Sequence, residues 1–298
     1  MKKLTMIALT MSAFFNISVA FAQETKTVFT FKVGDEEVSL LSEGEREGST
    51  DIIIGATQER LQRMVPDGFT SAINAFLVRS AGKNILIDTG IGRNLFDNLA
   101  SLSVSAEQID AVLITHGHGD HIGGLLQNGQ ASFPNAVLYL SQPEYDFWMS
   151  DEMMNQVEES RRGGFQGVRD VVSVYKERLQ LFNSDGIGTE SEMLLPGIQG
   201  VAAYGHTPGH TLFMIGSSEQ KLLVWGDLTH VMPVQMPYPE LAVTYDVDPK
   251  QAVESRLKVL EYISKNNIPV AGMHIAYPAM GNVKENSEKG GYEFIPLK

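Results

Sequence analysis

The most constraining feature of the sequence is a dense run of residues that bind metals. Residues 115–121 read Thr-His-Gly-His-Gly-Asp-His and directly follow an apolar run that predicts a short buried strand. Gly117 and Gly119 let the loop fold back, so that alternate side chains converge on one point. Imidazole and carboxylate are ligands for Zn²⁺ and similar cations where no thiolate exists, and the chain has no cysteine. A solvated loop with incidental histidines is the alternative, but average composition would produce this pattern in only about one such chain in ten thousand.

Three further ligand-type residues each follow the end of an apolar run. His206 comes after residues 201–204, Asp227 after residues 222–225, and His274 after residues 270–273. In α/β folds the ends of neighbouring strands meet at one edge of a sheet, where loops gather into a site. The sequence therefore predicts that these three residues join the histidine-rich loop.

Short strand patterns alternate with helical ones along the chain, which predicts a layered α/β body without separate linkers. Residues 28–33 and 38–42 flank Gly34-Asp35 and predict a hairpin. The Ser-x-Pro-Glu sequence of residues 141–144 predicts the capped start of a helix. A polar helical region is expected over about residues 151–182, interrupted near Gly163-Gly164, and a capped helix over 249–265.

The first 22 residues have the composition of a secretory signal. Lys2 and Lys3 precede a mostly apolar stretch that ends Ala20-Phe21-Ala22, which predicts cleavage before Gln23. An uncleaved membrane anchor is the alternative, since the stretch approaches the length of about 20 residues that spans a bilayer. We expect a signal peptide over residues 1–22, a single domain over 23–298, and a periplasmic or secreted protein without a stable anchor.

The charge of the chain excludes one class of partner. The formal net charge is −13, and it becomes −15 once Lys2 and Lys3 are removed. Such an acidic chain repels phosphate backbones, and the nearest basic pair, Arg161-Arg162, stands alone. We therefore expect a small-molecule substrate and no nucleic acid.

The pattern His-x-His-x-Asp-His followed by isolated His206, Asp227 and His274 resembles the metallo-β-lactamase superfamily. Within it the chain is similar to the methyl parathion hydrolase branch, which also contains lactonase-like members. The matching segments are residues 70–74, 86–90, 146–148, 206–211, 226–228 and 291–294. The resemblance covers about residue 38 to the C-terminus, and it implies a single-domain, four-layer αββα sandwich with metals at one edge of the sheets and, by analogy with the family, a homodimer.

The resemblance also implies a division of the ligands between two divalent metal ions. One ion would be held by His116, His118 and His206, and the other by Asp120, His121 and His274. Asp227 would bridge the two ions. Zn²⁺ is the first expectation, and Mn²⁺, Co²⁺ and Fe²⁺ accept the same ligands. Two such ions about 3.5–4 Å apart share a hydroxide that attacks a polarised C=O or P=O group. Asp227 and Asp120 are the expected catalytic residues, with Asp120 placed to take a proton.

The expected reaction is hydrolysis of small, fairly apolar esters, lactones or phosphotriesters. β-Lactamases of the superfamily place Cys or Ser where this chain has Asp227, so an amide hydrolase of that type is the less favoured alternative. A metal-bearing binding protein without turnover is the other. Lactonases often have Tyr three residues after the bridging Asp, whereas this chain has His230, which could donate a hydrogen bond to substrate instead.

Several residues have two interpretations each. Trp148, Phe165 and Phe96 resemble aromatic pocket positions of the branch, and plain core packing explains them equally. His210 supports either the local turn or a metal ligand. The triplet Asp88-Thr89-Gly90 also occurs in aspartic proteases, but those need two facing copies and this chain has one.

Overall fold

The computed structural model describes residues 26–189, 192–216 and 220–298. The predicted signal peptide, residues 1–22, lies outside this range. Among the described residues, no helix is both long enough and apolar enough to cross a membrane.

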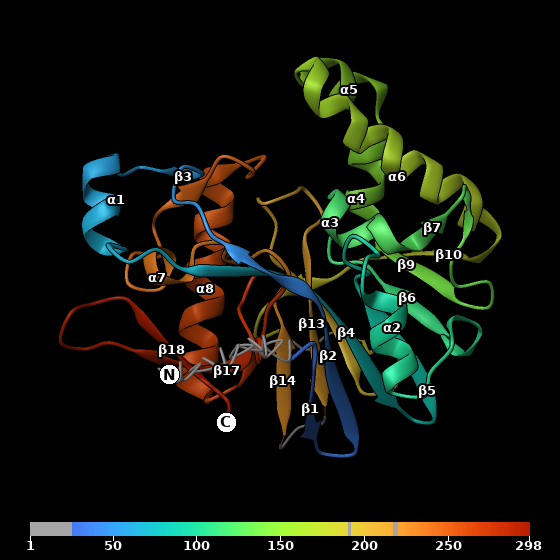
Figure 1. The fold of residues 1–298 in the computed structure, drawn as a ribbon. Coiled ribbons are helices and arrows are strands. Elements are labelled where there is room, and N and C mark those ends of the chain that lie inside the picture. Colours follow the sequence, from blue (N-terminus) through green and yellow to red (C-terminus); the bar gives the residue numbers. More distant parts are fainter. Residues whose placement is uncertain (1–25, 190–191, 217–219) are drawn as a thin grey trace, which may run out of the picture.

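Two mixed β-sheets pack face to face at the centre of the described chain (Figure 1). The first sheet has the strand order β1-β2-β4-β5-β6-β9-β10 and the second has the order β11-β12-β13-β14-β16-β17-β18. In the first sheet the strands are β1 (Val28–Val33), β2 (Glu36–Glu47), β4 (Thr70–Ser80), β5 (Lys83–Ile87), β6 (Ala111–Leu113), β9 (Val137–Ser141) and β10 (Leu179–Phe182). In the second they are β11 (Asp185–Gly186), β12 (Ile198–Ala202), β13 (Thr211–Gly216), β14 (Lys221–Val224), β16 (Val270–Ala271), β17 (Met280–Glu285) and β18 (Tyr292–Pro296). Two small pairs complete the strands: β3 (Ile53–Ile54) with β15 (Ala242–Val243), and β7 (Leu126–Gln127) with β8 (Gln130–Ala131).

The first sheet is buried on both faces because apolar side chains occupy successive positions of its strands. In β4, Phe76 and Val78 point into the cluster between the two sheets, whereas Ala75 and Leu77 point toward the outer helices. This alternation follows from the two-residue period of a strand.

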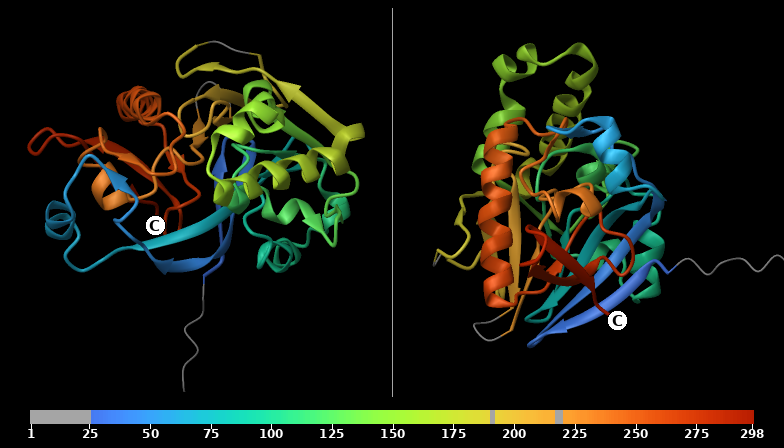
Figure 2. Two further views of the ribbon diagram at one scale, coloured as in Figure 1. Left: turned by 90° about the horizontal axis from the view of Figure 1, so that it is seen from above. Right: turned by 90° about the vertical axis from the view of Figure 1, so that its left-hand side faces the viewer.

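Helices cover the outer face of each sheet, on opposite sides of the molecule (Figure 2). The second sheet is covered by α8 (Pro249–Asn266), whose Val259, Leu260 and Ile263 join the central core. The first is covered by α2 (Leu95–Ser101), α4 (Gln142–Met149) and α6 (Arg162–Tyr175). The remaining α-helices are α1 (Gln58–Met64), α3 (Gly119–Ile122), α5 (Asp151–Gln156) and α7 (Met232–Gln235). The arrangement confirms the predicted αββα sandwich.

The helical region predicted over residues 151–182 differs from the structure in two respects. The interruption falls between α5 and α6, around Val157–Arg161, and Gly163-Gly164 lie inside α6. A helix tolerates the entropic cost of two glycines when it buries a strong apolar face, here including Phe165 and Tyr175. The last residues of the region form β10, which pairs in parallel with β9. Long-range pairing therefore overrides the local pattern there.

We expect Leu260→Ala on α8 to lower the free energy of unfolding by about 2–5 kcal/mol, because it deletes a side chain with 0% exposure. Leu257→Ala on the same helix removes a side chain that is 39% exposed, so the change should stay within about 0.5 kcal/mol. Urea denaturation of both variants at the same metal loading measures the difference. Equal losses would contradict the orientation of α8.

Candidate metal centre

The histidine-rich loop begins where β6 ends and is anchored from below by Asp88. The Asp88 carboxylate accepts hydrogen bonds from the Thr115 amide (2.8 Å) and the Thr115 hydroxyl (2.7 Å). Asp88 itself follows β5 and has a positive φ of 57°. Because β5 and β6 are parallel neighbours, Asp88 lies beneath the loop that it holds. The loop then runs through His116 and His118 into the short helix α3.

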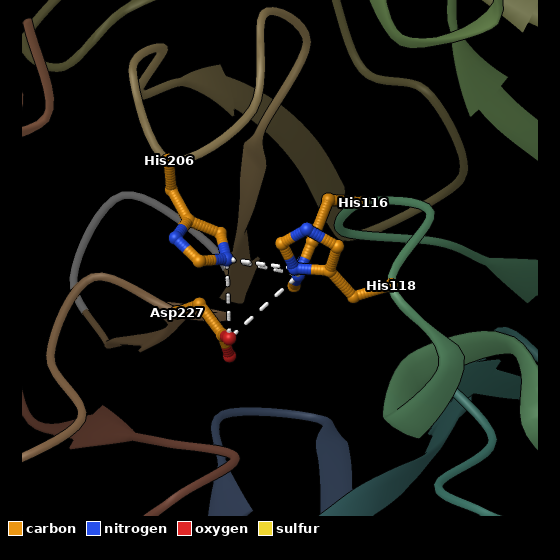
Figure 3. Close-up of side chains that lie close together, drawn as sticks. All are labelled: His116, His118, His206 and Asp227. Atoms are coloured by element: carbon orange, nitrogen blue, oxygen red, sulfur yellow. Dashed lines mark hydrogen bonds and ion pairs between the residues drawn. The ribbon is translucent and has the colours of Figure 1, made fainter. Parts of the chain in front are cut away.

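A first cluster consists of three imidazole rings and one carboxylate from three separate loops (Figure 3). His116 Nε2 lies 2.9 Å from His118 Nδ1 and 3.2 Å from His206 Nε2, and His206 Nε2 lies 3.0 Å from His118 Nδ1. Asp227 Oδ2 lies 3.6 Å from His116 Nε2 and 3.3 Å from His206 Nε2. These four groups face one point.

The hydrogen bonds on the far side of the rings show that this point fits a cation. The only proton of the Thr115 hydroxyl goes to Asp88, so that hydroxyl accepts a hydrogen bond from His116 Nδ1 at 3.1 Å. His206 Nδ1 donates to Asp246 at 2.9 Å. A neutral imidazole with a proton on Nδ1 has a bare lone pair on Nε2. The two Nε2 lone pairs, 3.2 Å apart, repel each other unless a positive charge lies between them.

A second cluster lies beside the first and contains Asp120, His121 and His274. His121 Nδ1 donates to Asp88 at 2.6 Å, and His274 Nδ1 donates to the Ala72 carbonyl at 2.9 Å. When neutral, both rings therefore also present a bare Nε2, and each Nε2 lies 3.7 Å from an Asp120 oxygen. His121 Nε2 is buried and has no hydrogen-bond partner. An orphaned buried nitrogen of this kind is a further sign that the donor set fits a metal ion.

Asp227 lies between the two clusters. Its Oδ1 lies 3.2 Å from both His121 Nε2 and His274 Nε2. Its Oδ2 faces His116 and His206, as given above, and also lies 3.2 Å from His274 Nε2. The Oδ1 atom is buried without a hydrogen-bond partner. Asp227 is 3% exposed, and its position between the clusters is the one expected of a carboxylate that bridges two cations.

The electrostatics of the site favour bound positive charge. Burial opposes protonation of His206, but hydrogen bonds with Asp227 and Asp246 outweigh burial and raise its pKa to about 9. Burial likewise opposes protonation of His121, while Asp227, Asp88 and Asp120 raise its pKa well above the usual value. Burial and the neighbouring imidazoles lower the pKa of His116 far below its usual value. The carboxylates thus stabilise positive charge here, and His/Asp ligands of this kind suit two divalent cations.

His210 supports a ligand as well as its own turn. Its Nδ1 donates to the Ala203 carbonyl at 3.0 Å, and its Nε2 accepts the amide of Asp227 at 3.0 Å. The preceding Gly226 has a φ of 54°, and a Cβ there would lie 2.5 Å from His210 Nε2. His210 therefore fixes the backbone of Asp227 and is not itself one of the side chains that face the candidate metal position.

Sequence reasoning missed Asp246, which lies 7% exposed beneath His206. Its Oδ1 accepts from His206 Nδ1, its Oδ2 accepts from the Val243 amide at 3.0 Å, and Arg256 Nη2 lies 4.0 Å from Oδ2. Nothing in the sequence distinguishes Asp246 from Asp248, which caps α8. The role of Asp246 is visible only in the folded chain, where its loop, 40 residues further along the sequence, lies against His206.

A cavity of about 520 Å³ opens over both clusters. Its lining includes five histidine and aspartate side chains of the site: His118, Asp120, Asp227, His230 and His274. The lining also includes the apolar or aromatic residues Ile52, Phe69, Val231 and Tyr245 and the charged residues Arg46 and Glu47. His230 is the only one of the four predicted substrate residues in this lining. Its Nε2 is turned toward Asp227 Oδ2 at 3.0 Å, and its ring stacks on His274 with centroids 5.1 Å apart.

Trp148, Phe165 and Phe96, for which pocket lining and core packing were both open, are not in this lining. Trp148 and Phe165 are 4% and 2% exposed and pack on each other with ring centroids 4.8 Å apart. Phe96 stacks on Phe133 at 5.8 Å and borders a separate hollow beside α2. Burying these rings removes more apolar area from water than exposing them in a cavity, so core packing explains their positions.

The aspartic-protease interpretation of Asp88 does not match the structure. The Asp88 carboxylate is fully buried, and Thr115 and His121 occupy its oxygens, as described above. It therefore serves as an anchor beneath the metal site.

Comparison with known proteins agrees with this geometry. The family profile described as "Metallo-beta-lactamase superfamily" matches residues 68–267, a range that contains every residue of the two clusters except His274. The solved structure of the hydrolase AbOPH, of the β-lactamase superfamily, is 28% identical with a TM-score of 0.82 over 91% of this chain and 98% of that chain. The structure of AidC, a dizinc quorum-quenching lactonase, is 26% identical with a TM-score of 0.82 over 91% of this chain and 97% of that chain.

Curated relatives match over shorter segments. A UPF0173 metal-dependent hydrolase of Koribacter versatilis is 32% identical over 95 residues, which are 32% of this chain and 39% of that protein. The chain spans only 22–39% of the length of this and similar curated relatives.

Proposed function

Since the chain belongs to the metallo-β-lactamase superfamily and is a metal-dependent hydrolase, we propose that it is a dizinc enzyme that cleaves small, fairly apolar esters, lactones or phosphotriesters. The observation that carries this proposal is the position of Asp227. Its two carboxylate oxygens face two separate clusters at the floor of one cavity. A site for a single metal ion, or a purely structural site, would not need both carboxylate oxygens to face ligand clusters.

The candidate ligands would be shared between two cations. His116, His118 and His206 would hold one cation, Asp120, His121 and His274 the other, and Asp227 would touch both. When bound, two such cations supply Lewis-acid polarisation of a C=O or P=O group and a water-derived nucleophile near neutral pH. Asp120 lines the cavity and its side chain is 31% exposed, so the oxygen that does not hold the cation would be placed to take a proton from a reacting group.

The proposed substrate class is supported by the cavity and by two relatives. A volume of about 520 Å³ accommodates a small molecule, and Phe69, Val231 and Tyr245 offer apolar contact next to the ligands. AidC is described as a lactonase, and AbOPH as a hydrolase of the same superfamily. Both are similar to this chain over nine tenths of its length, which makes ester-type bonds the first ones to test.

A panel of chromogenic aryl esters, lactones and paraoxon-type triesters tests the proposal with zinc-loaded protein. We expect hydrolysis of at least one class with saturation kinetics. If the protein hydrolyses no substrate class although it holds two zinc ions, the hydrolase proposal is refuted and a metal-bearing binding protein is supported instead. Hydrolysis of β-lactams alone would favour the amide-hydrolase alternative.

We also propose that the protein acts outside the cytoplasm. The support is the signal-like composition of residues 1–22. Expression of the full chain followed by N-terminal sequencing should give a mature protein that begins at Gln23. A cytoplasmic protein that retains Met1 would refute export.

We expect His230→Ala to lower kcat/KM by about 10–100-fold while two metal ions are retained. His230 lines the cavity, and its Nε2 contacts Asp227 Oδ2, so its removal both enlarges the cavity and deletes one contact of the Asp227 carboxylate. Tyr245→Phe, at a side chain that is 50% exposed on the cavity wall, is the matched control and should change kcat/KM by less than about threefold. Steady-state kinetics with metal analysis measure both variants. An unchanged kcat/KM in His230→Ala would contradict this role.

A further inference from the structure

Glu144 is a fully buried carboxylate in the first turn of α4 that contacts two loops of the metal centre. Its Oε1 accepts hydrogen bonds from the Gly117 amide at 2.8 Å and from Trp148 Nε1 at 2.6 Å. Its Oε2 accepts from the Thr207 hydroxyl at 2.6 Å and from the Gly209 amide at 2.9 Å. One side chain therefore ties together segments that lie 27 and 63–65 residues away from it in the sequence.

All four partners of Glu144 are donors. An ionised carboxylate accepts all four, whereas a protonated one could donate only to the Thr207 hydroxyl and would then lose the hydrogen bond that this hydroxyl gives. Burial raises the pKa of Glu144 above its usual value, and the four hydrogen bonds offset part of that rise. In the part of the chain that the structure describes, no lysine, arginine or histidine forms an ion pair with it. The geometry thus fits a buried negative charge that lacks a cationic side chain, which is costly unless another positive charge lies nearby.

The contacts of Glu144 adjoin the three histidines of the first cluster. Gly117 separates His116 from His118, and Thr207 directly follows His206. The Trp148 ring, which also donates to Glu144, lies edge-on to the His118 ring at 5.9 Å. None of these partners is bonded to a ring of the second cluster, in which Asp88 holds His121 Nδ1 and the Ala72 carbonyl holds His274 Nδ1.

Two glycines permit the close approach. A Cβ on Gly117 would lie 2.4 Å from Trp148 Nε1, and a Cβ on Gly209 would lie 2.1 Å from the Glu144 nitrogen. The loops can therefore reach the carboxylate only with glycine at these two positions. This packing leaves Glu144 little freedom to move away.

We propose that Glu144 is a positioning residue for the first metal site alone. Its carboxylate fixes the loops that carry His116, His118 and His206, and its charge is compensated by the cation bound there. The proposal rests on the metal assignment of the proposed function and is independent of the substrate. It follows that loss of the charge weakens the first site and leaves the second site unchanged.

The test measures zinc affinity in variants that retain one site each. His274→Ala leaves the first site, and His206→Ala leaves the second. Adding Glu144→Gln, which keeps the shape and removes the charge, should weaken zinc binding by about 10–100-fold in the His274→Ala background. In the His206→Ala background the change should be under about threefold, the scatter expected for uncoupled sites. Chelator competition on the metal-free proteins gives both dissociation constants.

The control is Glu152→Gln, which removes the same charge from an exposed side chain on α5 and should leave both affinities unchanged. Equal weakening in both backgrounds, or none in either, would overturn the proposal.

If Glu144→Gln fails to fold by circular dichroism, Thr207→Val and Thr207→Ser replace it in the same two backgrounds. Valine removes one donor to Glu144 and should weaken only the first site, whereas serine should restore it; the same affinity for valine and serine would overturn the proposal. Wild-type protein that binds no zinc would refute the metal assignment itself, whereas zinc binding without hydrolysis would refute only the substrate class.

Discussion

Asp227→Asn is expected to lower the hydrolytic kcat/KM by at least about 10³-fold, which corresponds to about 4 kcal/mol of lost transition-state stabilisation. The carboxylate faces His121 and His274 with one oxygen, and His116 and His206 with the other. An amide has one oxygen and an NH₂ group, so it cannot offer an acceptor to both clusters, and it also removes the charge that offsets two cations.

The same variant should hold fewer than two metal ions per chain. Asp146→Asn, an exposed carboxylate on α4 whose contact is Gln142, is the matched control and should keep full activity and both ions. Initial rates and elemental analysis of the two variants give the comparison. Retention of both the wild-type rate and two metal ions in Asp227→Asn would contradict the bridging assignment.

Removal of metal by a chelator is expected to reduce hydrolysis to the uncatalysed rate and to lower Tm by at least about 10 °C. A ligand present at 1,000 times its Kd stabilises the folded state by about 4 kcal/mol per site. For a domain of this size, each 1 kcal/mol shifts Tm by about 2–4 °C. Without cations, nothing holds the ring nitrogens of His116 and His206, 3.2 Å apart, in place, and the buried Asp227 carboxylate loses the positive charges that it faces.

Differential scanning fluorimetry and an activity assay before and after EDTA, followed by zinc addition, check this expectation. Zinc should restore both Tm and activity, and magnesium at the same concentration serves as the control, because Mg²⁺ prefers oxygen ligands. Activity that survives complete metal removal would contradict the account.

The ligand set could be predicted because its signals are local in the sequence. The histidines and aspartate of residues 116–121 stand together, and His206, Asp227 and His274 each follow the end of an apolar strand. Parallel and antiparallel neighbours in the two sheets bring those strand ends to the same edge, so position along a strand was enough to group them. The layered fold could be predicted for the same reason, because strands and helices show their two periods directly.

The residues that support the ligands could not be predicted in the same way. Glu144 has the sequence of an ordinary helix start, Ser-x-Pro-Glu, yet its side chain turns inward to two loops. Asp246 is one of several acids before α8, and only tertiary contact selects it. Whether Trp148 and Phe165 lie at the substrate could not be decided from the sequence, because sequence shows that a ring is buried, but not whether it lies in the core or on a cavity wall.

Elemental analysis of the purified chain, after gel filtration in chelator-free buffer with zinc supplied during expression, tests the dinuclear site most directly. The account predicts two zinc ions per chain, one for each cluster around Asp227. One ion or none per folded chain would contradict it.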